Sequence, residues 1–221
     1  MSVIAIDFAG LAHRFVAAQL AGDRAEALRV VVDDGVRRGA RVIDLQAHVI
    51  RAAQQQIGVL WQRNQISIAQ EHLATGIAQV VTARLFELAP LAKRNGKRVA
   101  VACVEGERHE FPARLIADYL DQAGFTVRYF GADLPTDHLV RELAKDRPHV
   151  VALSATMSFH LPALRATIAA VRAELGEHAP IIVGGHALRW SPALAAELGV
   201  TTAAAEPDEV VATIQRMAEA T

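Results

Sequence analysis

The sequence predicts two domains of different class: a four-helix bundle over residues 1–92 and a five-stranded, doubly wound parallel α/β domain, Rossmann-like or flavodoxin-like, over residues 97–221. Two observations predict this division. From Phe8 to Leu91 apolar residues recur at helical spacing. Beyond a short polar break, short apolar runs alternate with amphipathic segments, a pattern typical of a parallel sheet covered by helices.

Helix start and stop signals divide the first half into four segments. Asp23 with Glu26 resembles a capping box, Gly39 ends the helix that this box begins, and Ser67 with Gln70 resembles a second box. The predicted helices are 6–20, 24–38, 41–60 and 68–89.

The last of these helices carries an apolar stripe and ends at the domain boundary. Leu73, Ile77, Val80 and Leu85 lie at helical spacing, and we expect them to pack this helix against the other three. The segment from Pro90 to Lys97 is polar and contains a turn signal, so we place the boundary there.

The second half alternates strand and helix signals. The predicted strands are 99–104, 126–130, 149–154, 180–183 and 200–204. The predicted helices are 112–123, 136–145, 160–174, 191–197 and 207–219. Ligands of such sheets bind beyond the carboxyl ends of the strands, where the strand order reverses. The loops after the first, third and fourth strands are therefore where we look for a site.

Composition and charge exclude several classes of protein. The formal net charge of −1, without runs of Lys or Arg, argues against direct nucleic-acid binding. The one cysteine, Cys103, lies in an apolar run and reads as a core residue, which fits a reducing compartment. No secretory signal and no stretch of about 18 apolar residues is present, so we expect a cytoplasmic protein that does not span a membrane.

A charged loop after the first strand contains Glu107 and His109. A carboxylate can fix the proton on one nitrogen of a nearby imidazole, which leaves the other nitrogen for a metal. Loops rich in Glu and His are usually just solvated, however, and no second His or Cys lies nearby at zinc-like spacing. Taken alone, this pair does not establish a metal site.

Three loops taken together are more specific. Ser154 follows the third strand and Gly184-Gly185 the fourth, and with Glu107 and His109 they resemble the signature of the cobalamin-binding domain family: Asp-x-His-x-x-Gly, then Ser-x-Leu, then Gly-Gly. The resemblance covers about residues 97–219, including the stretch Gly131-Ala132-Asp133-Leu134-Pro135. It implies that His109 replaces the cofactor's own dimethylbenzimidazole as the lower axial ligand of cobalt.

The resemblance also implies where the nucleotide tail of the cofactor lies. Ser154 would lie close to the displaced base, and Gly184 and Gly185 would allow backbone contact. Arg108 and Thr156 complete the predicted set of residues that bind the cofactor on this side.

The sequence departs from the family signature at three positions. Glu107 replaces Asp, Thr156 stands where Leu is common, and Pro112 stands where the signature has Gly. Glu is one methylene longer and can still reach the imidazole. Pro112 suits the first turn of a helix but lacks the clearance of glycine, so this departure bears on affinity.

The helical half carries a second resemblance. Trp61 is followed after nine residues by Glu71-His72, which resembles the Trp-x9-Glu-His motif of the CarH/LitR-type light receptors, whose chromophore is adenosylcobalamin. By match, Trp61 and Glu71 would contact the upper axial group and His72 would neighbour it. The alternative is a core tryptophan with a helix-start glutamate and a satisfied histidine.

Two histidines have open roles. Gln62 stands where the receptors that form a two-histidine adduct after light carry histidine, so either no adduct forms or another histidine takes the upper position, His72 being nearest in sequence. His160 lies just beyond the loop after the third strand. It could approach the cofactor tail, or simply cap a helix or face solvent.

These features predict a cobalamin-binding light sensor or regulatory protein that holds adenosylcobalamin and acts through a regulatory partner or self-association, as in transcription regulation. The alternative is a corrinoid methyl-carrier subunit of a methyltransferase system, holding methylcobalamin, and a third is a regulator that has lost tight cofactor binding. We expect no helix-turn-helix domain in this chain, because only seven residues precede Phe8. We expect no turnover by this chain itself.

Overall fold

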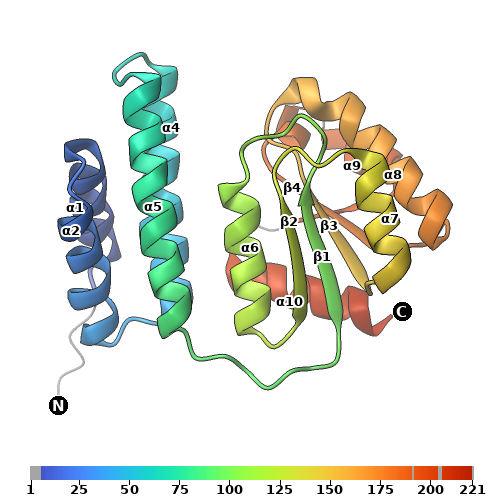
Figure 1. Ribbon diagram of the computed structural model, residues 1–221, viewed down its shortest axis with the longest axis horizontal. Helices are drawn as coiled ribbons and strands as arrows, with labels where there is room; N and C mark the ends of the chain where they lie inside the picture. Colours follow the sequence, from blue (N-terminus) through green and yellow to red (C-terminus); the bar gives the residue numbers. More distant parts are fainter. Residues whose placement is uncertain (1–5, 191, 204–205, 221) are drawn as a thin grey trace. The chain divides into compact units, whose positions relative to one another are not determined.

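The chain divides into two compact units, Met1–Pro90 and Leu91–Thr221. The computed structural model describes residues 6–190, 192–203 and 206–220. The first unit is helical, and the second is a parallel sheet covered by helices (Figure 1). The predicted fold class is confirmed.

Four helical segments form the first unit. They are α1 (Phe8–Ala21); α2 (Arg24–Leu28) with the π-helical η1 (Arg29–Asp33) and the 3-10 helix η2 (Val36–Arg38); α3 (Val42–Leu45) with the π-helical η3 (Gln46–Arg51) and α4 (Ala52–Gln62); and α5 (Ile68–Leu88). None of the described helices has the length and apolar character needed to cross a membrane.

Side-chain caps set the helix ends much as the sequence predicts. Ser67 and Gln70 form a full capping box at the start of α5. At the start of α2 the Asp23 side chain accepts a hydrogen bond from the backbone N–H of Glu26, whose carboxylate pairs with Arg29. Gly39 ends η2 in the left-handed conformation, with φ +95°.

The apolar stripe of α5 packs only in part as predicted. Ile77 and Leu85 are buried, but Leu73 and Val80 are 49% and 40% exposed, so the prediction is wrong for these two. The buried face of α5 instead consists of Ala74, Ile77, Ala78, Val81, Thr82 and Leu85. Both stripes have helical spacing, and the small alanines let the face that contains them approach the neighbouring helices more closely.

Five parallel strands form the sheet of the second unit. They are β1 (Arg98–Cys103), β2 (Thr126–Gly131), β3 (Val150–Ser154), β4 (Ile181–Gly184) and β5 (Thr201–Thr202), in the order β2-β1-β3-β4-β5. The helices are α6 (Phe111–Gln122), α7 (Thr136–Asp146), α8 (Leu161–Leu175), α9 (Pro192–Glu197) and α10 (Pro207–Glu219). The predicted ends agree within one or two residues, and the predicted helix start at 191 and strand end at 204 lie outside the described residues. The strand order reverses between β1 and β3, which is where a ligand site is expected.

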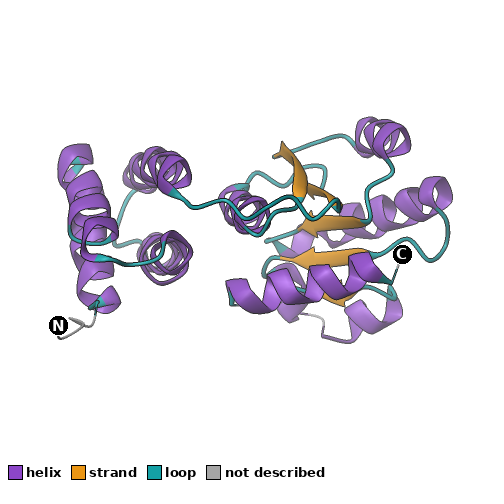
Figure 2. Ribbon diagram, turned by 90° about the horizontal axis from the view of Figure 1, so that it is seen from below, coloured by secondary structure: helices purple, strands orange, loops and turns teal. Residues whose placement is uncertain are grey.

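Helices cover both faces of the sheet (Figure 2), and alternate residues of the central strands build one core on each face. Val99, Val101 and Cys103 of β1 pack with α6 and α10. Ala100 and Ala102 of the same strand pack with α7, α8 and α9. Strands buried on both faces need the near-continuous apolar runs that the sequence shows, and Cys103 is the core residue that we predict.

The segment between the units is fastened to the second one. The backbone N–H of Ala92 donates to the carbonyl of Gln122, and that of Asn95 donates to the carbonyl of Gly124, both at 2.9 Å. Gly124 has φ +91°, and a side chain there would meet the carbonyl of Lys93. The polar break after Pro90 is therefore an ordered edge of the α/β unit.

Candidate cofactor site

The loops at the switch point are joined by backbone hydrogen bonds. The N–H of Val104, at the end of β1, donates to the carbonyl of Ser154 at 3.1 Å. The N–H of Ala155 donates to Gly184 at the end of β4, also at 3.1 Å. The structure thus brings together the three loops that the sequence singles out.

Glu107 is the centre of this site. Its side chain is fully buried, and its Oε1 accepts hydrogen bonds from the backbone N–H of His109 at 2.8 Å and from Nδ1 of the same residue at 2.5 Å. Its Oε2 accepts from the backbone N–H of Thr156 at 2.6 Å and lies 2.9 Å from Nδ1 of His160. One carboxylate therefore fastens the loop after β1 to the loop after β3.

These donors keep Glu107 ionised. Burial by itself raises the pKa of the carboxyl, but the hydrogen bonds from the side chain and backbone of His109, from Thr156 and from His160 outweigh it. The pKa of Glu107 is held well below its usual range. The site therefore contains a fixed negative charge directly beside His109.

His109 has the geometry of a single metal ligand. Because Nδ1 faces the ionised Glu107 carboxylate, Nδ1 is the nitrogen that donates its proton there, and Nε2 is the other ring nitrogen. The side chain is half exposed, so a ligand can reach it. A neutral imidazole held by a carboxylate suits the axial position of cobalt, and the longer Glu reaches the ring as expected.

A self-contained metal centre does not fit the same residues. Within the described part of the chain, no three His, Cys, Asp or Glu side chains cluster in a way that could hold a metal ion. A single exposed histidine oriented by a carboxylate suits a cofactor that brings its metal with the other ligands already attached.

His160 belongs to this site more closely than the sequence indicates. It is buried, and its ring contacts Glu107 from a position 53 residues further along the chain. It neither faces solvent nor caps a helix through its side chain. Local spacing gives no signal for such a contact, because the fold alone brings the two loops together.

The remaining predicted residues of this unit have distinct surroundings. Ser154 is buried at the end of β3, whereas the side chain of Arg108 is 84% exposed. Gly185 has φ +94°, and a Cβ there would lie 2.1 Å from the carbonyl oxygen of Ala155. Gly184 has room for a methyl group, so Gly185 is the position that requires glycine.

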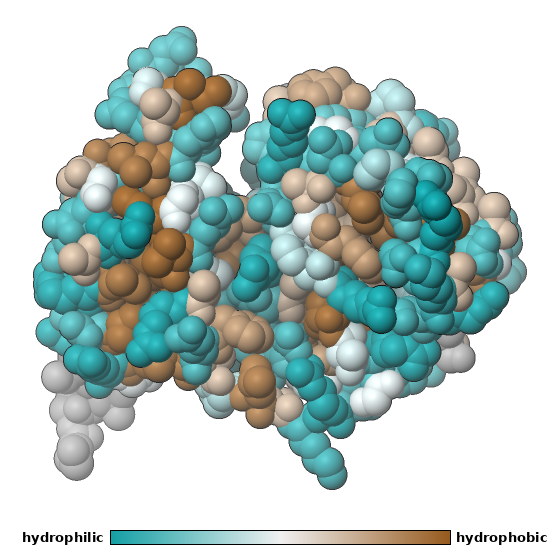
Figure 3. Space-filling view, in the orientation of Figure 1, coloured by the Kyte–Doolittle hydropathy of each residue, from teal (hydrophilic) through white to brown (hydrophobic). Residues whose placement is uncertain are grey.

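The predicted upper-face residues lie on the surface of the helical unit. Trp61 is 40% exposed, so the alternative of a core tryptophan is not what the structure shows. His72 has a side chain that is 72% exposed, and its Nε2 lies 3.7 Å from Oε2 of Glu71. Figure 3 shows apolar side chains on the visible surface of this unit, which has a large share of the exposed apolar residues of the molecule.

Glu71 is connected to the interior of the helical unit. Its Oε1 accepts from the hydroxyl of Thr75 at 2.9 Å, and that hydroxyl accepts from Nε2 of Gln54 at 3.1 Å. The amide of Gln54 in turn accepts from the fully buried Gln19 at 3.3 Å. This chain of hydrogen bonds fixes the orientation of the Glu71 carboxylate.

Comparison with known proteins identifies the family. A family model described as a B12 binding domain matches residues 97–214, and a second model with the same description matches residues 11–85. These two matches fall one in each unit of the structure.

Two groups of relatives have similar sequences. The chain is 33% identical over 156 residues to the HTH-type transcriptional repressor CarH of Myxococcus xanthus, covering 69% of this chain and 50% of that protein. It is 26% identical over 139 residues to dimethylamine corrinoid protein 1 of Methanosarcina acetivorans, covering 62% of this chain and 65% of that protein. The chain thus spans between half and two thirds of the length of these relatives.

Solved structures share the fold. The monomethylamine corrinoid protein of Methanosarcina barkeri superposes with a TM-score of 0.79 at 17% identity, covering 94% of this chain and 98% of that one. A cobalamin-binding protein from Desulfitobacterium hafniense gives 0.50 at 24% identity, with 96% and 99% covered. The B12 binding domain model matches residues 97–214, more than half of the chain, and this match shows that the chain belongs to the B12-binding domain family and is a cobalamin-binding protein.

Proposed function

We propose that this chain is a cobalamin-dependent light sensor or regulator, with His109 as the lower axial ligand of cobalt and the helical unit as the part that responds to the upper group. The observation that carries the proposal is the exposure of Trp61 in the motif Trp61-x9-Glu71-His72. The 33% identity to the CarH repressor supports it.

The state of Glu107 supports the proposal that His109 is the lower ligand. The ionised carboxylate holds the Nδ1 proton of His109, orients the ring and makes Nε2 more basic. Ser154, Gly184 and Gly185 lie at the ends of the neighbouring strands, where the nucleotide tail of the cofactor would be received, with Arg108 and Thr156 beside His109 and Glu107 in the two loops.

The upper group would contact Trp61 and Glu71. The indole supplies a broad, rigid apolar surface, and the oriented carboxylate of Glu71 can accept hydrogen bonds from ribose hydroxyls. Bound adenosylcobalamin supplies a cobalt–carbon bond that light can break. Trp61 and Glu71 then have different contacts in the dark and lit states, which is what a switch of assembly or partner binding requires.

His72 is our candidate for the upper ligand after photolysis. Gln62 stands next to Trp61 and offers an amide, which has no basic nitrogen. The imidazole of His72 is largely exposed and has the required nitrogen.

Mixing the apoprotein with adenosylcobalamin in darkness and then illuminating it tests the proposal. We expect a stable complex, a light-induced change of absorption spectrum and a change of size by gel filtration. Trp61→Ala should weaken retention of the adenosyl form, whereas Val59→Ala, at a residue that is similarly exposed, should not. No change of assembly and no effect of Trp61→Ala would contradict the sensor.

A second candidate is a corrinoid methyl carrier that presents methylcobalamin to a methyltransferase. The similarity to dimethylamine corrinoid protein 1 favours it. When the experiment is repeated with methylcobalamin, the carrier predicts tight binding of that form, no change of size in light and no preference for the adenosyl form.

His109→Ala tests the lower ligand in either case. We expect the bound cofactor to lose the spectrum of protein imidazole ligation and affinity to fall. His138→Ala is the matched control, because His138 is also an exposed histidine beside a carboxylate, that of Asp137. Unchanged spectra for His109→Ala would contradict the assignment.

A further inference from the structure

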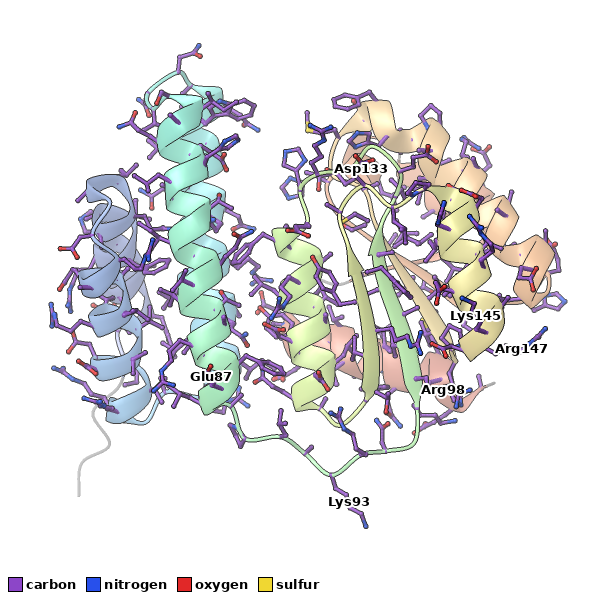
Figure 4. All side chains as sticks on the ribbon, in the orientation of Figure 1. Glu87, Lys93, Arg98, Asp133, Lys145 and Arg147 are labelled. Atoms are coloured by element: carbon purple, nitrogen blue, oxygen red, sulfur yellow. The ribbon has the colours of Figure 1, made fainter. Side chains whose placement is uncertain are left out.

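We propose that Asp133 is a positioning residue for His109, because it fastens the backbone of the loop that carries this ligand, whereas the hydrogen bond of His160 is to the Glu107 side chain. The inference rests on the proposed ligation by His109. Asp133 lies in the loop between β2 and α7, at the carboxyl ends of the strands (Figure 4).

Two hydrogen bonds join Asp133 to the His109 loop. Its carboxylate accepts from the backbone N–H of Gly106 at 2.8 Å, and its own backbone N–H donates to the carbonyl of Glu107 at 2.9 Å. Arg108 adds a distant ion pair, with Nε 3.9 Å from Oδ2 of Asp133. Three successive residues before His109 are therefore in contact with Asp133.

The backbone of Asp133 adopts an unusual conformation to make these contacts. Its φ is +50°, and the described residues contain two other non-glycine residues with positive φ, Asn64 and Arg147. Asp and Asn tolerate this region better than other side chains. The hydrogen bonds to the His109 loop offset the cost of this conformation.

Glu107 is consequently held at both ends. Thr156 and His160 bind its carboxylate, and Asp133 binds its carbonyl. With the backbone and the side chain of Glu107 both fixed, the ring of His109 is aimed before the cofactor arrives. Such preorganisation raises affinity, since less freedom is lost on binding.

Three variants isolate this role. Asp133→Asn keeps an acceptor for Gly106 and tolerates positive φ. Asp133→Gly relieves the backbone but removes the acceptor. Arg147→Gly is the matched control, because Arg147 also has a positive φ, +44°. It lies at the C-terminal end of α7, whereas Asp133 precedes the N-terminal end of that helix (Figure 4). Thermal unfolding of each apoprotein reports the fold independently of the cofactor.

The readout is the fraction of bound cobalamin with a protein nitrogen on cobalt. It is measured by electron paramagnetic resonance of the cobalt(II) form with heavy-nitrogen-labelled protein, which distinguishes a protein nitrogen from the cofactor's own base. We expect Asp133→Gly to lower the equilibrium constant for imidazole ligation about three- to tenfold, the effect of one hydrogen bond. Asp133→Asn and Arg147→Gly should remain within about twofold of the wild type.

The proposal would be overturned if Asp133→Gly kept the wild-type fraction of cobalamin with a protein nitrogen on cobalt. It would also be overturned if Asp133→Asn or Arg147→Gly lost that ligation. If Asp133→Gly does not fold, Asp133→Ser replaces it, since the serine hydroxyl is one bond shorter and does not reach Gly106. Failure of His109 itself as ligand would appear separately, as an unlabelled signal in the wild-type protein or as a labelled signal that persists in His109→Ala.

Discussion

Glu107 and His160 face each other at 2.9 Å, from Oε2 of the carboxylate to Nδ1 of the ring, although 53 positions separate them in the sequence. Both side chains are buried. A buried carboxylate is stable only when donors surround it, so His160 is a structural requirement of the charge that orients His109.

Replacing His160 should therefore be costly unless the donor is kept. We expect His160→Ala to lower the free energy of unfolding by about 2 kcal/mol, because a buried hydrogen bond to a charged group is lost. His160→Asn should recover most of this, since its amide nitrogen can take the place of Nδ1. Chemical denaturation of the apoprotein measures both.

Phe159→Ala is the control for that series. Phe159 adjoins His160 in sequence and packs edge-on against its ring, with the centroids 4.3 Å apart, but its side chain has no donor to offer Glu107 and is 67% exposed, so its replacement should change stability by less than about 0.5 kcal/mol. Equal effects of His160→Ala and Phe159→Ala would show that the contact with Glu107 contributes nothing.

The low pKa of Glu107 makes the free energy of unfolding depend on pH in the acid range. Because folding lowers this pKa, the stabilisation is fully present above the ordinary value of 4.5 and is lost as the pH falls toward the folded value. Glu107→Gln should lower the free energy of unfolding by about 3 kcal/mol at neutral pH, since the NH2 group of the glutamine must face a donor. The difference between the two proteins should shrink below about pH 4.5. A difference that stays constant down to the acid limit of folding would contradict this.

What could be predicted from the sequence was local. Glu107 and His109 lie two residues apart, so their contact at 2.5 Å follows from the spacing, and the apolar runs of β1 and β3 specify a sheet buried on both faces. The contacts of His160 and Asp133 depend on which strands are neighbours, and periodicity does not specify strand order.

Helix α5 shows the same limit on a smaller scale. Leu73 and Ile77 both have helical spacing, yet Leu73 is 49% exposed and Ile77 is 2% exposed. The small side chains of Ala74 and Ala78, on the same face as Ile77, decide which face approaches the bundle, and hydrophobicity alone ranks these alanines below leucine.

The two faces of α5 should differ in energy. Ile77→Ala should destabilise the protein by about 3 kcal/mol, because it leaves a cavity in a packed core. Leu73→Ala should cost less than about 1 kcal/mol, since half of that side chain already faces solvent. Denaturation curves for the two variants measure the difference, and a larger loss for Leu73→Ala would contradict the packing of α5 described above.

Gly185 gives the sharpest test of the carboxyl edge of the sheet. A Cβ at this position would lie 2.1 Å from the carbonyl oxygen of Ala155, and φ is +94°. Gly185→Ala should therefore cost at least about 3 kcal/mol. Gly96→Ala, with φ +77° and nothing within 4 Å, should cost about 1 kcal/mol for the conformation alone.

Gly185→Ala should also weaken cofactor binding, because the added methyl group would displace Ala155 and with it the following residue, Thr156. Moving Ala155 moves Thr156, whose N–H donates to Glu107 at 2.6 Å, and so loosens the carboxylate that orients His109. We expect cobalamin affinity to fall in the folded fraction of Gly185→Ala and to stay at the wild-type level in Gly96→Ala. Equal cobalamin affinity of the two variants would mean that Thr156 and Glu107 hold their positions independently of the loop that follows β4.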